Sequence, residues 1–195
     1  MKRCTLILSS LLLVFGVSFP CYAKKLKQKT LIEWENLNSK IISLYKQGDY
    51  NLAIAVAHKA LQIVEQEGGI DNPKVALSLN NLALLYKSQG QYEEAEKLYK
   101  FSLTFGELAF GPDNPSLATS LNNLAVLYSI QGRYEEAESS YKRALEIKLE
   151  NLGDEHLSVS QSMNNLADLY YSQGQYSQAE PLYKQSLSIR EKDCL

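Results

Sequence analysis

Two adjacent asparagines recur inside an apolar pattern at three places in the chain. The segments are LNNLALLY from residue 79, LNNLAVLY from residue 121 and MNNLADLY from residue 163, each 42 positions after the last. The residues are Asn80, Asn81, Asn122, Asn123, Asn164 and Asn165. Because an asparagine amide carries two donors and an acceptor, a row of them can hydrogen-bond the backbone of an extended peptide.

Other polar residues in the sequence have structural explanations. The glutamate pairs at 93–94 and 135–136 resemble catalytic carboxylates, but each stands in the first turn of a predicted helix, where the helix dipole favours negative charge. His58 and His156 are isolated, whereas a metal site needs clustered ligands. We find no Ser/His/Asp set, no glycine-rich phosphate loop and no Cys/His nucleophile pattern. We therefore expect no enzyme, no cofactor and no metal.

The residues around each asparagine pair predict a helical hairpin. Leu121, Leu124, Ala125 and Tyr128 follow the i, i+3, i+4, i+7 spacing of one helix face. Gly132 ends that helix, as a left-handed glycine commonly does, and a second helix with its own small and aromatic positions follows. The same pattern recurs 42 residues earlier and later, and we call positions that differ by 42 residues a column. The expected fold class is all-α.

The linkers divide the chain into units. Asn72–Pro73 and Asn114–Pro115 are typical of an N-cap followed by proline at the first helical position. We predict repeats at 72–113, 114–155 and 156–195. Residues 24–71 match more weakly, with a first helix expected over about 33–46, and form a degenerate N-terminal hairpin.

This pattern resembles the tetratricopeptide repeat superfamily. The 42-residue period, the LNNLA and GxYEEAE motifs and the GxxNP linkers are similar to kinesin-light-chain-type repeats, which are widespread in bacterial proteins. The resemblance covers roughly residues 34–193. It implies a right-handed α-solenoid of about four repeats, whose first helices line a concave groove that binds peptides, and it implies no particular partner.

The groove residues are expected on the face of each first helix opposite its core stripe. They are the six asparagines together with Leu84, Lys87, Val126, Ser129, Asp168 and Tyr171. The asparagines would bind the peptide backbone, while Lys87, Asp168 and Tyr171 would provide selectivity. In the alternative, one asparagine of each pair bonds to the neighbouring repeat and sets the stacking register.

Residues 1–23 have the features of a secretory signal peptide. Lys2 and Arg3 precede an apolar run, and Ala23 is a small residue at the expected cleavage site. The run is too short for a good membrane span, so we expect an exported, periplasmic or secreted protein with no span after cleavage. The mature chain would carry 18 basic and 22 acidic residues, because the segment contains two of the 20 basic residues. That balance excludes a basic nucleic-acid surface.

We expect a non-enzymatic interaction module that binds a peptide or protein segment of unknown identity. The alternative is a structural or truncated piece of a longer array that acts through self-association. The chain ends at REKDCL without the polar helix that usually covers the last repeat. This alternative predicts a homodimer through the C-terminal repeat, with Cys194 near the contact.

Overall fold

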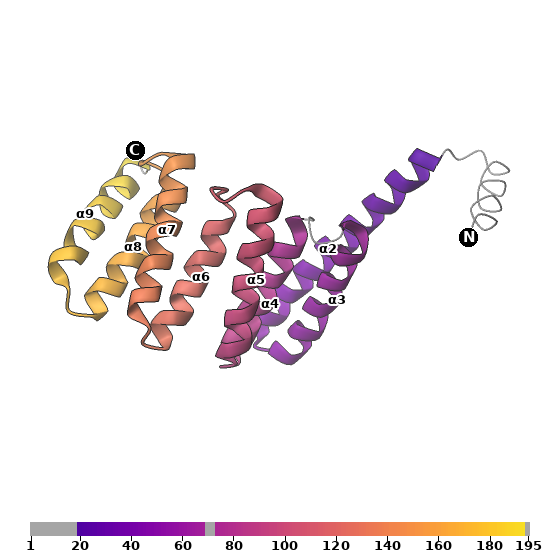
Figure 1. Cartoon of the computed structure of the whole chain (residues 1–195), viewed down its shortest axis with the longest axis horizontal. Helices are drawn as coiled ribbons and strands as arrows, with labels where there is room; N and C mark the ends of the chain where they lie inside the picture. The colour runs from indigo at the N-terminus through magenta and orange to yellow at the C-terminus, as the bar shows by residue number, and fades with distance from the viewer. Residues whose placement is uncertain (1–18, 69–72, 194–195) are drawn as a thin grey trace.

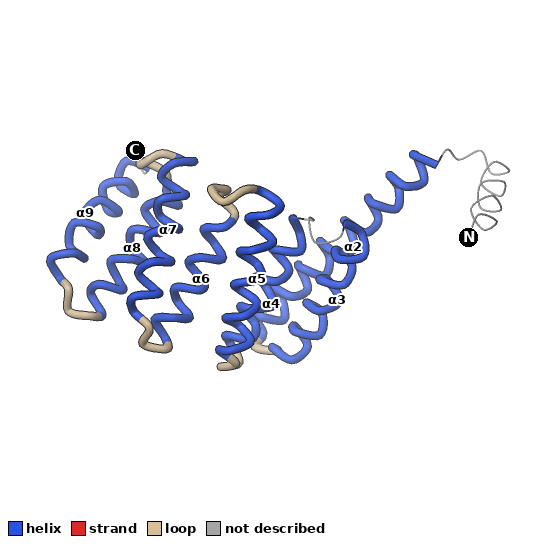
Figure 2. Tube along the Cα trace, in the orientation of Figure 1, coloured by secondary structure: helices blue, strands red, loops and turns tan. Residues whose placement is uncertain are grey.

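A computed structural model describes residues 19–68 and 73–193, and every regular element in these ranges is an α-helix (Figures 1 and 2). The helices are α2 (Phe19–Gln47), α3 (Tyr50–Gly68), α4 (Pro73–Ser88), α5 (Tyr92–Phe110), α6 (Leu117–Ile130), α7 (Tyr134–Leu152), α8 (Leu157–Ser172) and α9 (Tyr176–Asp193).

The helices form a row of four hairpins, α2/α3, α4/α5, α6/α7 and α8/α9. Each helix packs most extensively on its hairpin partner, and the second helix of one hairpin packs on the first helix of the next. The first helices α4, α6 and α8 also contact one another in turn. This arrangement, visible as a progression along the long axis of Figure 1, confirms the predicted all-α solenoid.

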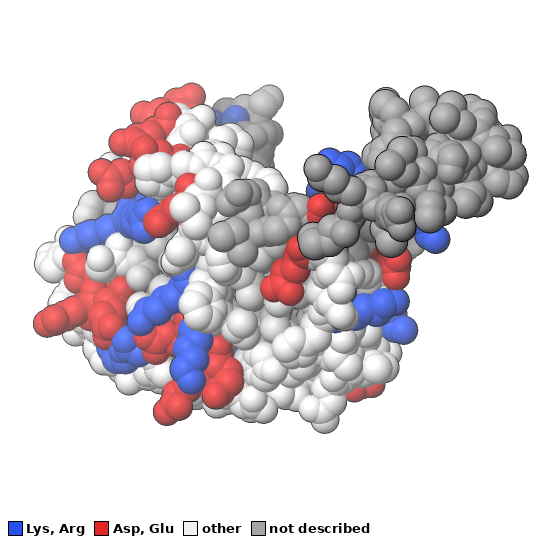
Figure 3. All heavy atoms as spheres, turned by 45° about the vertical axis from the view of Figure 1, so that its right-hand side comes forward, with Lys and Arg blue, Asp and Glu red and all other residues white. Residues whose placement is uncertain are grey.

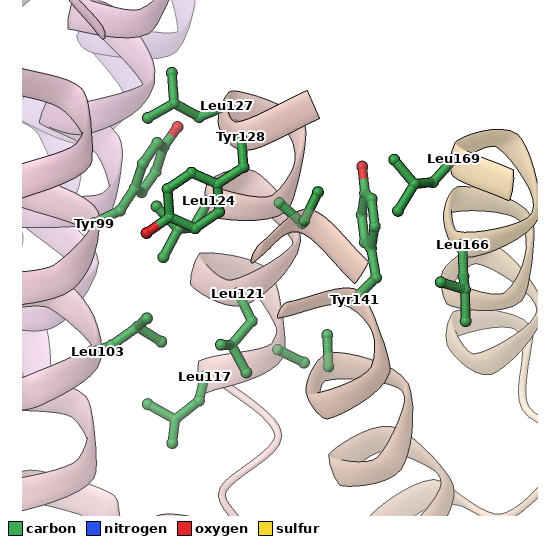
Figure 4. Packing of buried hydrophobic residues seen from close by; sticks show 14 of the residues in the cluster. Tyr99, Leu103, Leu117, Leu121, Leu124, Leu127, Tyr128, Tyr141, Leu166 and Leu169 are labelled. Atoms are coloured by element: carbon green, nitrogen blue, oxygen red, sulfur yellow. The ribbon is translucent and has the colours of Figure 1, made fainter. Parts of the chain in front are cut away.

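Alanine and tyrosine columns form the core between helices. Ala125 of α6 and Ala137 of α7 are both 0% exposed, so the two helices of the hairpin approach closely. Figure 4 shows Tyr141 of α7 between α6 and α8, with its ring beside Leu169. Because the second helix of each hairpin packs on both sides, the core continues along the row instead of forming separate centres.

Glycine in the left-handed region ends each first helix. At Gly132, φ is +73°, and the N–H groups of Gly132 and Arg133 donate to the carbonyls of Ser129 and Tyr128 at 3.1 and 2.9 Å. This is the Schellman arrangement, which satisfies carbonyls at a helix end and requires a residue without a Cβ penalty. The same pair of bonds recurs at Gly48, Gly90 and Gly174.

Two helix starts differ from the sequence-based expectation. Helix α6 begins at Leu117, not at Pro115, because the Asn114 side chain accepts hydrogen bonds from Ser116 N and Oγ and holds an extra turn before the helix. Helix α2 begins at Phe19, well before the expected start near residue 33. It therefore continues through Ala23, while residues 1–18 of the predicted signal peptide, Asn72 and Cys194 lie outside the described residues.

Candidate functional site

The predicted groove residues lie on first helices that contact one another, and we call their solvent-side surface the first-helix face. Its members are Leu84 and Lys87 of α4, Asn122, Val126 and Ser129 of α6, and Asn164, Asp168 and Tyr171 of α8. Asp168 and Tyr171 are exposed, and the other members are partly buried. The face is therefore most accessible on α8.

Asn80 differs from this set because it is buried, with 7% of its surface exposed. Its Oδ1 accepts hydrogen bonds from Ser120 Oγ at 3.3 Å and from Asn123 Nδ2 at 3.1 Å, both on α6. Ser120 in turn shares a 2.9 Å bond with Ser102 Oγ of α5, which donates to the Ala76 carbonyl. Asn80 thus belongs to a polar network that joins α4, α5 and α6.

The same asparagine bond occurs one junction earlier. Asn38 of α2 stands in the column of Asn80, and its Oδ1 accepts from Asn81 Nδ2 at 2.9 Å. In both junctions the first asparagine of one repeat pairs with the second asparagine of the next. These bonds match the alternative in which one asparagine of each pair bonds to the neighbouring repeat and sets the stacking register. They occupy the side-chain oxygens of Asn38 and Asn80, which are then not available to a bound peptide.

The third junction breaks this series. Asn122 Oδ1 is buried and has no hydrogen-bond partner, while Asn165 accepts from Gln161 of its own helix at 3.0 Å. Ser162, in the column of Ser120, accepts instead from Lys148 Nζ at 2.8 Å. Ala144 occupies the column of Ser102 and supplies no hydroxyl. The counterparts of the two donors to Asn80, Ser162 and Asn165, therefore accept hydrogen bonds from other residues and do not bond to Asn122.

Lys87 is a second polar group without a partner on this face. It is partly buried, and no described residue forms a hydrogen bond or salt bridge with its ammonium group. Burial lowers the pKa of Lys87 because the charged form has lost water without gaining a counter-charge. A negatively charged group on a partner would reverse that loss.

An aromatic and acidic cluster lies at the C-terminal end of the face. Tyr183 of α9 donates a 2.5 Å hydrogen bond to Asp168 Oδ1. Burial and the adjacent Asp168 raise the pKa of Tyr183 to about 12, because burial disfavours the charged phenolate and the carboxylate repels it. Tyr171 lies edge-on to Tyr176, the first residue of α9, with ring centroids 5.2 Å apart. Tyr176 was not among the predicted site residues, because its column recurs at every hairpin turn.

The glutamates of the second helices take part in contacts between repeats. Arg133, the N-cap residue of α7, binds Glu96 of α5 and Glu136 of α7, and its guanidinium lies 4.2 Å from the centre of the Tyr128 ring. The hydrogen bond from Arg133 is the main cause that lowers the pKa of Glu96 to about 2. The sequence signal for this contact is Arg133 itself, since its column otherwise contains Asp49, Gln91 and Gln175 and no other basic residue.

The described surface also carries mixed charges and a hollow. Figure 3 shows acidic and basic side chains intermixed on the visible face, in agreement with the ion pairs among the described residues. A hollow of about 460 Å³ lies between α2 and α3, lined by Leu26, Thr30, Ile63 and Glu67 among others.

Within the ranges described, no cluster of His, Cys, Asp and Glu has the composition of a metal site. None of the described helices is long and apolar enough to cross a bilayer.

The fold and its face define an α-solenoid scaffold of the protein–protein interaction class. The chain belongs to the tetratricopeptide repeat family, whose model matches residues 36–105, 80–150 and 116–192. Proteins of this family are typically non-enzymatic interaction modules.

Solved structures with kinesin-light-chain-like repeats have the same fold. BtubC (BKLC) from P. vanneervenii has a TM-score of 0.70 and 28% sequence identity over 78% of this chain and 61% of its own. A Podosopora anserina protein described as a putative kinesin light chain with nearly identical TPR-like repeats has a TM-score of 0.66 and 22% identity over 88% of this chain and 86% of its own. A second structure with that description has a TM-score of 0.68 at 22% identity over the same shares. This chain thus spans less than two thirds of the length of BtubC, and no curated protein matches the sequence significantly.

Proposed function

We propose that the protein binds an extended segment of a partner protein along the first-helix face. The observation that carries this proposal is the buried, unpaired Asn122 Oδ1 on α6. A buried polar atom without a partner costs roughly 1–3 kcal/mol, and native proteins seldom leave one unsatisfied. When the Asn122 side chain turns this oxygen towards the first-helix face, a backbone N–H of a bound segment supplies the missing donor.

The proposal assigns different roles to the asparagines. Asn80 and Asn123 hold adjacent repeats in register, while Asn122 and Asn164 contact the partner backbone. Lys87 selects an acidic group through its unpaired ammonium. The partner segment is thus defined by the groups that contact it: an extended backbone and an acidic side chain near α4.

The test compares Asn122→Ala with Asn80→Ala. Peptides are selected against the wild-type protein from a displayed library of random peptides, and a labelled peptide is titrated by fluorescence anisotropy. We expect Asn122→Ala to weaken binding about fivefold and not to lower the free energy of unfolding, because it removes a buried oxygen that has no internal bond. Asn80→Ala should instead lower the free energy of unfolding by about 1–2 kcal/mol, because it breaks two internal bonds.

Two results would contradict the proposal. Either the library yields no binding peptide, or the selected peptides bind wild type and Asn122→Ala equally. Asn165→Ala is the matched control, because the Asn165 oxygen already bonds to Gln161 within α8.

We also propose that the protein acts in the periplasm or outside the cell. The support is the sequence of residues 1–23, with its basic start, apolar run and small-residue exit. The protein recovered from cells should then begin at Lys24, and N-terminal sequencing that finds Met1 would contradict export with cleavage.

Self-association is a second candidate function, favoured by the exposure of Leu187 on α9. Leu103 and Leu145 stand in the same column on α5 and α7, where the following hairpin covers them: Leu103 is 9% exposed and Leu145 is partly buried. Leu187 is 56% exposed. A second copy that packs on α9 would bury this side chain as the internal junctions bury its counterparts.

A further inference from the structure

Tyr171 and Tyr176 form an exposed aromatic pair at the turn between α8 and α9. They are 59% and 62% exposed, and their rings meet at an interplanar angle of 61°. In this T-shaped contact one ring presents its edge to the other, so much of the π-surface still faces solvent. Two large aromatic side chains are therefore held together in water at this turn.

The same two columns differ in the other hairpins. They contain Tyr45 with Tyr50, Lys87 with Tyr92, and Ser129 with Tyr134. The middle two hairpins therefore have no aromatic pair. The pair of Tyr45 and Tyr50 is partly buried, and the Tyr45 hydroxyl accepts from Ser88 at 3.5 Å. Among the described hairpins, the aromatic pair is exposed on both rings only at α8/α9.

A carboxylate completes this cluster. Asp168 lies one helical turn before Tyr171, is exposed, and forms no salt bridge with any Lys or Arg that the structure describes. Tyr183 donates to one of its oxygens and so orients the group. The column of Asp168 otherwise contains Ile42, Leu84 and Val126, so the charge is particular to this repeat.

The geometry points to a subsite at Asp168, Tyr171 and Tyr176 that binds a cationic side chain, Lys or Arg, of the partner segment. The faces of both rings carry the negative end of the aromatic quadrupole and attract a cation. The carboxylate adds a charge-assisted hydrogen bond to the same group. An acidic side chain would be repelled by Asp168, and an apolar one would leave the carboxylate without a counter-charge.

This subsite rests on the proposed function and adds a chemical requirement to it. Lys87 on α4 has the opposite charge to Asp168 on α8, two repeats further along the same face. A bound segment would thus place a basic side chain over α8 and an acidic one over α4. This polarity determines which charged side chain of the segment lies over which repeat.

The experiment uses the full-length protein and the same random-peptide selection. We expect the selected peptides to be enriched in Lys or Arg. For one labelled peptide, Asp168→Asn and Tyr171→Ala should each weaken binding about fivefold, as expected for a partly desolvated cation–π or ion pair. Tyr171→Phe keeps the ring and should bind as wild type does. Tyr134→Ala removes the tyrosine in the column of Tyr176 from a turn without an aromatic pair, and it should have no effect.

A double-mutant cycle separates this subsite from general damage. Replacing the basic residue of the peptide by Gln should weaken binding to wild type, and the same replacement should matter little for Asp168→Asn. Equal losses with both proteins, or selected peptides without a basic residue, would overturn the cationic subsite while leaving binding at Asn122 intact. A selection that yields no peptide would overturn both proposals.

Discussion

At the scale of single residues, one tyrosine column has different environments along the row. Tyr99, Tyr141 and Tyr183 occupy equivalent positions on α5, α7 and α9. Tyr183 donates to Asp168, whose column contains the apolar Leu84 and Val126 in the other two repeats. The Tyr99 hydroxyl is buried without a partner, while the Tyr183 hydroxyl is bonded.

This difference predicts opposite effects for the same substitution. Tyr99→Phe should raise the free energy of unfolding by about 1 kcal/mol, because it removes a buried hydroxyl that has lost its water. Tyr183→Phe should lower it by about 0.5–1.5 kcal/mol, because it removes a satisfied bond. Urea unfolding of both variants measures these changes. Destabilisation by Tyr99→Phe would show that its hydroxyl has a partner.

At the scale of elements, the junction between the second and third hairpins depends on Glu96. Its carboxylate on α5 accepts from Arg133 at the start of α7 and from the Tyr128 hydroxyl of α6. The Glu96 carboxylate therefore links α5, α6 and the start of α7, which belong to two repeats. The next junction repeats this pattern with Glu138, whose carboxylate accepts from Tyr170 at 2.8 Å, but Gln175 stands there in the column of Arg133.

The low pKa of Glu96 predicts a pH-dependent stability. Because folding lowers this pKa to about 2, the ionised carboxylate stabilises the folded state above the unfolded pKa of roughly 4.3. That contribution should be lost as the pH falls from about 5 towards 2. Glu96→Gln should thus be less stable than wild type at pH 7 and nearly equal to it at pH 2, by urea unfolding. An equal deficit at both pH values would assign the effect to packing.

At the scale of the whole molecule, stability comes from contacts between neighbours along a row. Each hairpin buries its apolar residues against the hairpins before and after it, and no described hairpin packs on one two places away except through weak contacts. The outer side of α9 therefore has no neighbour among the described helices. Self-association would give α9 a neighbour from a second copy of the chain.

Self-association through α9 predicts a dimer that depends on Leu187. Light scattering of the mature protein at high concentration should show a dimer, and Leu187→Lys should make it monomeric by placing a charge in the contact. Leu108→Lys, on the exposed side of α5, is the matched control and should leave the dimer unchanged, since Leu108 is 63% exposed and lies on a different helix. A monomeric wild type would exclude this candidate.

Much of the architecture was predictable because it depends on local patterns. The apolar stripes, the glycine at each turn and the 42-residue period predicted the helices from α4 onward and their pairing. The early start of α2 was missed because residues 19–32 lie outside the repeat pattern on which the prediction relied. The start of α6 was misplaced because Asn114 caps a turn in place of the helix itself.

The sequence by itself determined that this chain is a row of helical hairpins with asparagines on the first helices. Only the tertiary structure decided what those asparagines do, because their partners come from helices about 40 residues away. Asn80 meets Ser120 and Asn123, whereas Asn122 meets neither a free serine nor a second amide. The columns are nearly identical, and the difference arises from Ala144 and Lys148, which change the donors around an otherwise equivalent oxygen.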